Sequence, residues 1–363
     1  MSHILREYGV EFALIFGVSF GLSLLLTPLT MRLSYRYGIV KAPGGRRRHT
    51  TTMPLLGGWA IVISFLVTVL IAQFLPVERT DEKEIIRLTG LIIGSLIMAM
   101  VGFFDDKYEL SPLPVYITQL LVGGIAVFFL IIIESFNNPL NGQTVTGWPY
   151  VVTVTLTLLW LGFMMNTVNW LDGLDGLAGG VTVIASFMIF YHATFELNQV
   201  SVGILALALV GATLGFLIFN FHPAKVFMGG SAWFLGYALG VLGIIGGAKV
   251  ATILLVMGLP LFDVTWQIMR RLLSGKNPMK GDRGHLHFLL ADMGFDQRTI
   301  VIGYYIFCAL FGSIALITTS RLFKLISLLV MLTILVLVFA ITSWQATRHQ
   351  TEEKTSGSTH SQS

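Results

Sequence analysis

The chain contains long stretches without a single charged residue. No Asp, Glu, Lys or Arg occurs in the 29 residues between Arg48 and Glu78, nor in the 37 residues between Glu134 and Asp172. A helix that crosses the hydrocarbon core of a bilayer needs about 20 predominantly apolar residues. Uncharged runs of this length recur along most of the sequence, and they predict an all-α polytopic membrane protein.

We expect about eleven transmembrane helices. Their ranges are 11–31, 54–75, 88–104, 114–133, 149–165, 177–194, 199–218, 231–247, 250–268, 299–319 and 325–346. The ninth range gives the weakest signal, because Asp263 lies inside it. The sequence therefore predicts a single integral membrane domain over residues 1–346, followed by a polar, disordered cytoplasmic tail over residues 347–363.

The composition excludes several other classes of protein. Hydrophobic residues make up 55% of the chain and charged residues only 12%, whereas soluble domains carry roughly 25% charged residues. We therefore exclude a water-soluble enzyme, a disordered protein and a nucleic-acid-binding protein, and expect no nucleic acid partner. The net charge of +4 is better explained by Lys and Arg in the cytoplasmic loops of a membrane protein.

Lys and Arg are unevenly distributed between the two sets of predicted loops. With the N-terminus outside and the C-terminus cytoplasmic, 16 of the 23 Lys and Arg residues fall on the inner side and 7 on the outer side. Enrichment of Lys and Arg in cytoplasmic loops favours this orientation. The same orientation places on the inner side Asp105, Asp106, Asp172, Asp175, Asp263 and Asp282. Acids near membrane depth are costly and usually functional.

The most specific polar pattern follows the fifth predicted span. Asn166, Asn169, Asp172 and Asp175 recur at intervals of three, so a helix would place four oxygen-bearing side chains along one face. Mg²⁺ takes oxygen ligands, typically one or two carboxylates together with phosphate oxygens of a substrate. A glycine-rich turn with polar caps is the structural alternative, and it explains the glycines but not the helical register.

Two adjacent carboxylates, Asp105 and Asp106, stand at the inner end of the third predicted span. Neighbouring carboxylates repel each other unless a cation or a shared proton relieves them. Alone, the pair would indicate a solvated helix end. Beside the Asn and Asp pattern, it indicates candidate catalytic groups.

Two predicted inner loops combine arginine with histidine. The longer one contains the segment from Asp282 to His287, with the sequence Asp-Arg-Gly-His-Leu-His, and an extended segment would point both histidines the same way. Arg and His can bind a pyrophosphate through charge-assisted hydrogen bonds. The first inner loop, with three arginines before His49, could hold the same phosphates or anionic lipid headgroups, and both interpretations stay open.

With these motifs the sequence resembles the polyprenyl-phosphate N-acetylhexosamine-1-phosphate transferases, the WecA/TagO group of the MraY-like glycosyltransferase 4 superfamily. The resemblance extends from Gly38 to about Leu290 and follows six motifs in order. The motifs are the Arg-x-His loop with Pro54 and Gly57-Gly58, Gly102-x-x-Asp105-Asp106, Asn166-x-x-Asn169-x-x-Asp172-Gly-x-Asp175, Phe219-Asn220-Phe221 through Phe227-Met228-Gly229, Pro260-x-x-Asp263 with Arg270-Arg271, and Asp282-Arg283-x-His285-x-His287.

The resemblance implies an enzyme that transfers a sugar-1-phosphate, most often N-acetylglucosamine-1-phosphate, from a UDP-sugar to undecaprenyl phosphate. The products would be a lipid-linked pyrophosphoryl sugar and UMP, the first step of cell-envelope polysaccharide synthesis. It implies Mg²⁺ as cofactor, with Mn²⁺ as an alternative. It further implies a multi-pass protein of the cell inner (plasma) membrane with its active site on the cytoplasmic face. The implied partners are undecaprenyl phosphate, a UDP-N-acetylhexosamine, the lipid bilayer and, as one option, a second copy in a homodimer.

Roles for individual residues also follow from the resemblance. Asp105 and Asp106 would serve the lipid-phosphate nucleophile, and the metal ligands would be Asn169, Asp172 and Asp175. The candidate catalytic residues are Asp105, Asp106, Asp172, Asp175 and His285. The candidate substrate-binding residues are Arg46, Arg48, His49, Asn166, Asn169, Asn220, Lys225, Asp282, Arg283 and His287.

The chain departs from the family pattern after the segment Phe227-Met228-Gly229. The family has an Asp there that helps to bind Mg²⁺, whereas this chain continues with Gly230 and is one residue short. Smaller departures are Leu113 and Val115 in place of basic residues, Lys41 in place of an acid, and Phe288 in place of a further histidine. A catalytically impaired family member is therefore an alternative. A membrane transporter is a weaker one, because neither internal repeats nor acids at the bilayer centre are evident.

Overall fold

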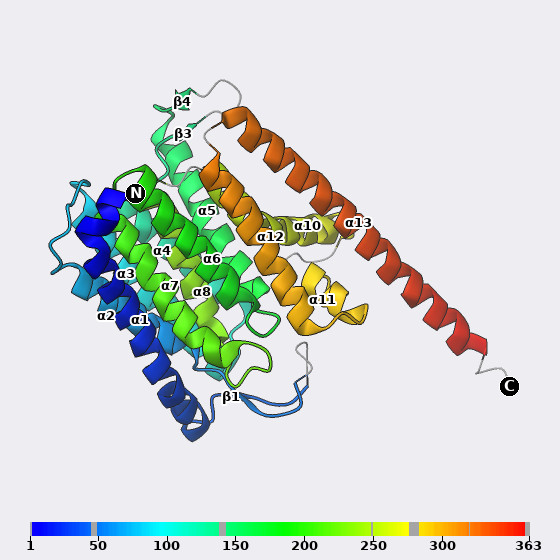
Figure 1. The fold of residues 1–363 in the computed structure, drawn as a ribbon. Helices are drawn as coiled ribbons and strands as arrows, with labels where there is room; N and C mark the ends of the chain where they lie inside the picture. Colours follow the sequence, from blue (N-terminus) through cyan, green and yellow to red (C-terminus); the bar gives the residue numbers. More distant parts are fainter. Residues whose placement is uncertain are drawn as a thin grey trace.

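The computed structural model is a bundle of helices, most of which run side by side (Figure 1). It describes residues 2–44, 49–137, 143–247, 250–275, 283–318 and 320–359. The α-helices are α1 (Ser2–Arg36), α2 (Gly58–Ala72), α3 (Glu84–Tyr108), α4 (Pro112–Phe128), α5 (Tyr150–Leu171), α6 (Leu177–Tyr191), α7 (Val200–Asn220), α8 (Ala232–Ile245), α9 (Val250–Val256), α10 (Gly258–Leu273), α11 (Leu286–Asp292), α12 (Gln297–Ile317) and α13 (Arg321–Thr359).

Short elements complete the fold. A π-helix, η1 (His192–Glu196), continues α6, and a 3-10 turn, η2 (Gly229–Ser231), precedes α8. Strands β1 (Val40–Lys41) and β2 (Met53–Pro54) pair antiparallel, and so do β3 (Phe136–Asn137) and β4 (Thr144–Val145). The two hairpins lie near opposite ends of the bundle (Figure 1).

The helices confirm an all-α polytopic membrane protein. Among the residues that the structure describes, seven helices are long and apolar enough to cross a membrane, namely α1, α3, α5, α6 with η1, α7, α12 and α13. Three further predicted spans form the shorter apolar helices α2, α4 and α8. The 15 residues of α2 rise only about 22 Å at 1.5 Å per residue, less than a hydrocarbon core of about 30 Å. Eleven full-length crossings therefore stay a prediction.

The ninth predicted span, over residues 250–268, is wrong as a single helix. The structure divides it into α9 and α10, with a break at Met257. Pro260 has no N–H to donate to the carbonyl of Val256, so the helical ladder is interrupted at this point. The break leaves Asp263 in α10, a helix of 16 residues.

The tail predicted over residues 347–363 begins within the last helix of the structure. Helix α13 continues through Thr359 and carries most of the segment 347–363 as helix. Figure 1 shows its C-terminal half projecting away from the bundle. Residues such as Gln350, Glu352 and Lys354 have good helix propensity, which lets a preceding apolar helix continue into a polar segment.

Helix α8 lies at the centre of the bundle and positions its neighbours. All of its residues except Ile244 are buried, and it packs against α3, α5, α6 and α7. Glycine makes the approach of α5 close, because a Cβ on Gly236 would lie 2.5 Å from the backbone of Met164 and Met165. Small residues let membrane helices come together in this way. The ends of α3 and α5 are thereby held beside the start of α8.

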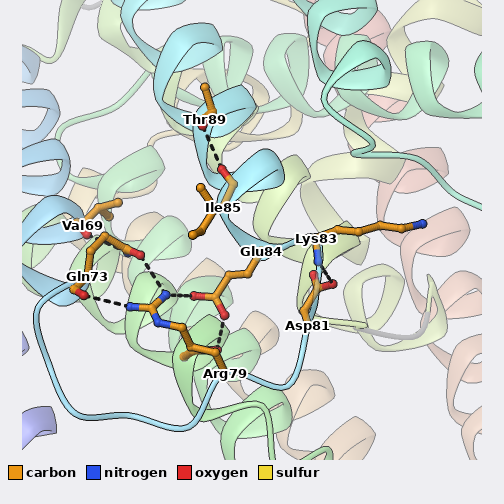
Figure 2. Close-up of polar contacts among 9 residues, drawn as sticks. Val69, Gln73, Arg79, Asp81, Lys83, Glu84, Ile85 and Thr89 are labelled. Carbon is orange, nitrogen blue, oxygen red and sulfur yellow. Dashed lines mark hydrogen bonds and ion pairs between the residues drawn. The ribbon is translucent and has the colours of Figure 1, made fainter.

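A polar network fastens the helix ends around the start of α3 (Figure 2). The side chain of Glu84 is only 5% exposed, and one of its oxygens pairs with Arg79. The same guanidinium nitrogen donates to Gln73 Oε1 at 2.8 Å. The second oxygen of Glu84 accepts the hydroxyl of Ser201, at the start of α7, at 2.7 Å. The network therefore connects the end of α2 with the starts of α3 and α7.

Replacing Glu84 by alanine is expected to lower the free energy of unfolding by about 2 kcal/mol, because Arg79 and Ser201 lose their buried acceptor. The exposed neighbour Glu82 supplies the control, and E82A should change stability by less than about 0.5 kcal/mol. Thermal unfolding in detergent measures both variants. If the variants E84A and E82A were equally stable, the network would have no stabilising role.

Candidate active site

A cavity of about 680 Å³ lies where the ends of several helices meet. Its walls come from β1, the ends of α3 and α5, the start of α4, η2 and the residues around the start of α11. The polar side chains that line it are Lys41, His49, Asp105, Asp106, Glu109, Tyr116, Asn166, Asn169, Asp172 and His285. Seven of these were predicted from the sequence as site residues, and in the fold they line the same cavity.

The two adjacent carboxylates of α3 differ in their surroundings. Asp106 accepts the backbone N–H of Gly230 with both oxygens, at 3.0 and 2.9 Å. The preceding residue, Gly229, has φ +62° and lies so near that a Cβ would come within 2.3 Å of Asp106 Oδ2. Only glycine adopts this conformation without strain. Asp106 therefore binds the turn η2 to α3, while the half-buried Asp105 lines the same cavity.

Helix α5 contributes the polar groups on the other side of the cavity. Asn166 donates from Nδ2 to Gln119 Oε1 of α4 and to the carbonyl of Gly162, both at 2.8 Å, so its amide is fixed in orientation. Asn169 lies one turn further on, and Asp172 forms the C-cap at ψ 46°. Both line the cavity.

The predicted helical face of four polar residues ends at Asp172. Beyond it the chain turns, because Gly173 follows and Gly176 adopts φ +80°. Asp175 lies in this turn and does not line the cavity. Its Oδ2 contacts His222 Nδ1 at 2.8 Å and accepts the N–H of Ala224 at 3.1 Å. Asp175 thus contacts groups outside the cavity lining that contains Asn169 and Asp172.

Asn220 fastens the same turn from the end of α7. Its Oδ1 accepts the N–H of Gly176 at 3.1 Å, and its Nδ2 donates to the carbonyl of Val226 at 2.8 Å. The side chain is buried but does not line the cavity. Asn220 and Asp175 therefore support the segment that leads into η2, and only indirectly the cavity.

The remaining predicted residues are distributed as follows. Arg283 binds the carboxylate of Asp292 at 2.6 Å and lies 4.9 Å from the ring centroid of Phe288, outside the cavity lining. Lys225 is exposed and His287 fully buried, and neither lines the cavity. Arg46, Arg48 and Asp282 lie outside the described residues.

The cavity lining includes an ion pair that the sequence did not predict. Lys41 Nζ contacts Glu109 Oε1 at 2.9 Å, and both side chains are exposed. The hydrogen bond from the Lys41 ammonium holds the pKa of the Glu109 carboxyl below its usual range. A lowered pKa keeps the carboxylate charged as the solution becomes more acidic, so the pair is lost only when the pH falls through that lowered value.

The oxygen donors of the cavity suit a hard cation. No group of three His, Cys, Asp or Glu side chains comes together as a metal site in the described ranges. However, Asp105, Asp106, Asn169 and Asp172 line one cavity, and Mg²⁺ is typically held by one or two carboxylates while substrate phosphates and water complete its shell. These residues therefore fit Mg²⁺ together with a phosphorylated substrate.

Fold and cavity together define a polytopic membrane protein with an acid-lined site at one end of its helices. Residues 88–247 match the model of glycosyl transferase family 4. The chain is 34% identical over 327 residues to a probable undecaprenyl-phosphate N-acetylglucosaminyl 1-phosphate transferase of Bacillus subtilis (strain 168), with 87% of each chain covered. It is 29% identical over 320 residues to a decaprenyl-phosphate N-acetylglucosaminephosphotransferase of Mycolicibacterium smegmatis, covering 80% of this chain and 77% of that one.

A third relative, the phospho-N-acetylmuramoyl-pentapeptide-transferase of Bacillus subtilis (strain 168), is 30% identical over 318 residues, covering 82% of this chain and 94% of that one. The chain therefore belongs to glycosyl transferase family 4, in the group of the polyprenyl-phosphate N-acetylglucosamine-1-phosphate transferases. The resemblance stated from the motifs is confirmed.

Proposed function

We propose that this protein transfers N-acetylglucosamine-1-phosphate from UDP-N-acetylglucosamine to undecaprenyl phosphate and releases UMP. The observation that carries the proposal is that the carboxylates of α3 and the Asn and Asp residues of α5 line one cavity, in a chain whose relatives are named as transferases of this kind. The transporter and the impaired family member are not favoured, because each relative compared above is named as a transferase.

The reaction joins two anionic substrates. An oxygen of the lipid phosphate attacks the phosphorus that carries the sugar, a new P–O bond forms, and the bond to the UMP oxygen breaks. Such a transfer needs alignment and neutralisation of charge more than covalent work by the protein. Mg²⁺, held by Asn169, Asp172 and a carboxylate of α3, would supply that neutralisation. Asp105 would accept a proton from the lipid phosphate, and His285 would contact a phosphate oxygen.

We propose the plasma membrane as location and the cytoplasmic side for the cavity. Two observations support this orientation. Lys and Arg are concentrated in the loops that join the helix ends around the cavity, as expected for cytoplasmic loops. The segments that line the cavity, from β1 to the start of α11, come from loops predicted to lie inside or from the ends of predicted spans that adjoin those loops. A cavity at this level is accessible to a soluble UDP-sugar and to a lipid headgroup.

Lys41 is expected to attract the soluble substrate. It is the one Lys or Arg among the described residues that line the cavity, and its ammonium contacts the carboxylate of Glu109 there. K41M should raise KM for UDP-N-acetylglucosamine about fivefold with kcat little changed, since an exposed charge contact contributes about 1 kcal/mol. K107M is the matched control, because Lys107 is exposed on α3 but does not line the cavity. Equal KM values for both variants would contradict this role.

Purified protein in detergent tests the proposed function. UMP release from UDP-N-acetylglucosamine should require both undecaprenyl phosphate and Mg²⁺, and chelation of the metal should abolish it. The proposal would be contradicted if no UMP were released from UDP-N-acetylglucosamine or from other UDP-N-acetylhexosamines. Thermal unfolding must first show that the protein used is folded.

A further inference from the structure

One buried carboxylate lies directly behind the cavity and has no role in the reaction described above. Asp263 is on α10, and its side chain is only 3% exposed. A charge in this position is costly unless hydrogen bonds and ionic partners compensate it. The contacts of Asp263 therefore indicate the role of its carboxylate.

Within the described part of the chain, the hydrogen bonds and ion pairs of the Asp263 side chain reach the start of α11. Oδ1 accepts the backbone N–H of Leu286 at 3.1 Å. Oδ2 lies 3.3 Å from Nδ1 of His285 and 3.7 Å from Nδ1 of His287. The two imidazole rings are nearly parallel, with an interplanar angle of 13° and a centroid distance of 5.6 Å. A single carboxylate thus holds two rings and the amide between them.

Of the two histidines, His285 is the one that lines the cavity. Its ring is held on a second side by Trp170, at a centroid distance of 5.6 Å, and Trp170 itself lies between Asn169 and Asp172 on the chain. The fully buried ring of His287 packs against Gly173, where a Cβ would come within 2.3 Å of Nε2. The histidine pair therefore connects Asp263 to the cavity wall that carries Asp172.

An ionised carboxylate can only accept hydrogen bonds, so the proton of His285 in this contact is on Nδ1. Nε2 is then the ring nitrogen left to act on a substrate, as a donor when the ring is protonated and as an acceptor when it is neutral. A carboxylate that fixes the tautomer and orientation of a histidine is a recurring device in catalytic and metal sites.

We propose that Asp263 is a positioning residue for the transfer reaction, acting through His285. It fixes the Nδ1–H tautomer and the ring orientation of His285, so that Nε2 is presented in the cavity to a phosphate oxygen of the substrates. The proposal rests on the proposed function for the identity of those substrates. The geometry of the carboxylate and the two rings is independent of that function.

D263N is the sharpest test, because asparagine keeps the shape and the oxygen that accepts the N–H of Leu286 but lacks the second acceptor and the charge. We expect kcat to fall about 100-fold, as for other partners of functional histidines, with KM for undecaprenyl phosphate within about twofold of wild type. T265V is the control, because Thr265 is an exposed residue of α10 whose hydroxyl donates to the carbonyl of Leu261 in its own helix. D263N with wild-type kcat would overturn the proposal.

A double-mutant cycle separates positioning from a purely structural role. If Asp263 acts through His285, the double variant D263N/H285A should be no slower than H285A alone, because the two residues act as one unit. The proposal would be overturned if the loss of kcat in the double variant equalled the product of the losses in the two single variants.

The third arm does not depend on turnover. With ¹⁵N-labelled histidine, the spectrum of the wild-type protein should show His285 protonated at Nδ1, and D263N should shift it toward the Nε2–H tautomer. A wild-type His285 without a proton on Nδ1 would overturn the proposal. This measurement uses the wild-type protein, so it remains decisive if D263N fails to fold. A wild-type chain that forms no product would instead contradict the proposed function.

Discussion

Replacing Asp172 by asparagine is expected to reduce kcat by about 100- to 1,000-fold with little change in stability. Asp172 is the C-cap residue of α5 and lines the cavity, where the oxygens of α3 and α5 would share a cation with the substrate phosphates. Removing one preorganised charged group from a site of this kind typically costs rate on this scale. Asparagine keeps the size and one carbonyl oxygen, so the melting temperature should stay within about 2 °C of wild type.

Asp175 provides the matched control, three residues further along the chain. Its carboxylate contacts His222 and accepts the N–H of Ala224, and it does not line the cavity. D175N should therefore show the reverse pattern, a loss of about 1–2 kcal/mol in the free energy of unfolding and a smaller loss of kcat than D172N. Equal losses of kcat at unchanged stability would contradict this distinction and return Asp175 to the metal site predicted from the sequence.

Replacing Gly102 by alanine is expected to remove both stability and activity. A Cβ at this position would lie 2.4 Å from the backbone carbonyl carbon and oxygen of Gly230. Backbone atoms cannot move aside as the end of a flexible side chain can, so α3 and η2 must separate. We expect the free energy of unfolding to fall by about 3 kcal/mol. The separation would also remove the amide of Gly230 from Asp106, and activity should be lost with it.

Gly124 on α4 serves as the control for this prediction, because a Cβ there would meet nothing within 4 Å. G124A should keep full activity and leave stability unchanged or raised by up to about 1 kcal/mol, since alanine has the higher helix propensity. Thermal unfolding and the transfer assay measure both variants. A stable and active G102A would contradict the close contact between α3 and η2.

Much of the fold was predictable from where charges are absent. A helix overlaps each predicted range, because an uncharged run of about 20 residues has few alternatives in a bilayer. The cavity residues Asp105, Asp106, Asn169 and Asp172 were predictable for the complementary reason. Polar groups at the inner ends of apolar helices are costly and are retained for function.

The rest depends on local breaks and long-range contacts. The polar face of α5 was extended too far, to Asp175, because the spacing of three continues although Gly173 and Gly176 end the helix. The ninth span is divided because Pro260 interrupts the hydrogen bonds of the helix. A count of apolar residues does not detect such a break. The contact between Asp263 and His285 joins residues 22 positions apart, and only the packing of α10 against the start of α11 reveals it.

The structure is also needed to interpret the segment after Gly229. The sequence indicates a missing acid there, whereas the structure shows the amide of Gly230 bound by Asp106 and its backbone packed on Gly102. A residue inserted between Gly229 and Gly230 would displace both contacts. The shortened segment is therefore compatible with an ordered cavity in the chain as it stands.

The most direct test of the proposed function is transfer of radiolabelled N-acetylglucosamine-1-phosphate to undecaprenyl phosphate in the presence of Mg²⁺. It should be measured for the native chain beside a variant with Asp inserted between Gly229 and Gly230. We expect labelled lipid product from the native chain, with less from the insertion variant. Product from the insertion variant alone would contradict this expectation, because the metal site of the native chain would then be incomplete.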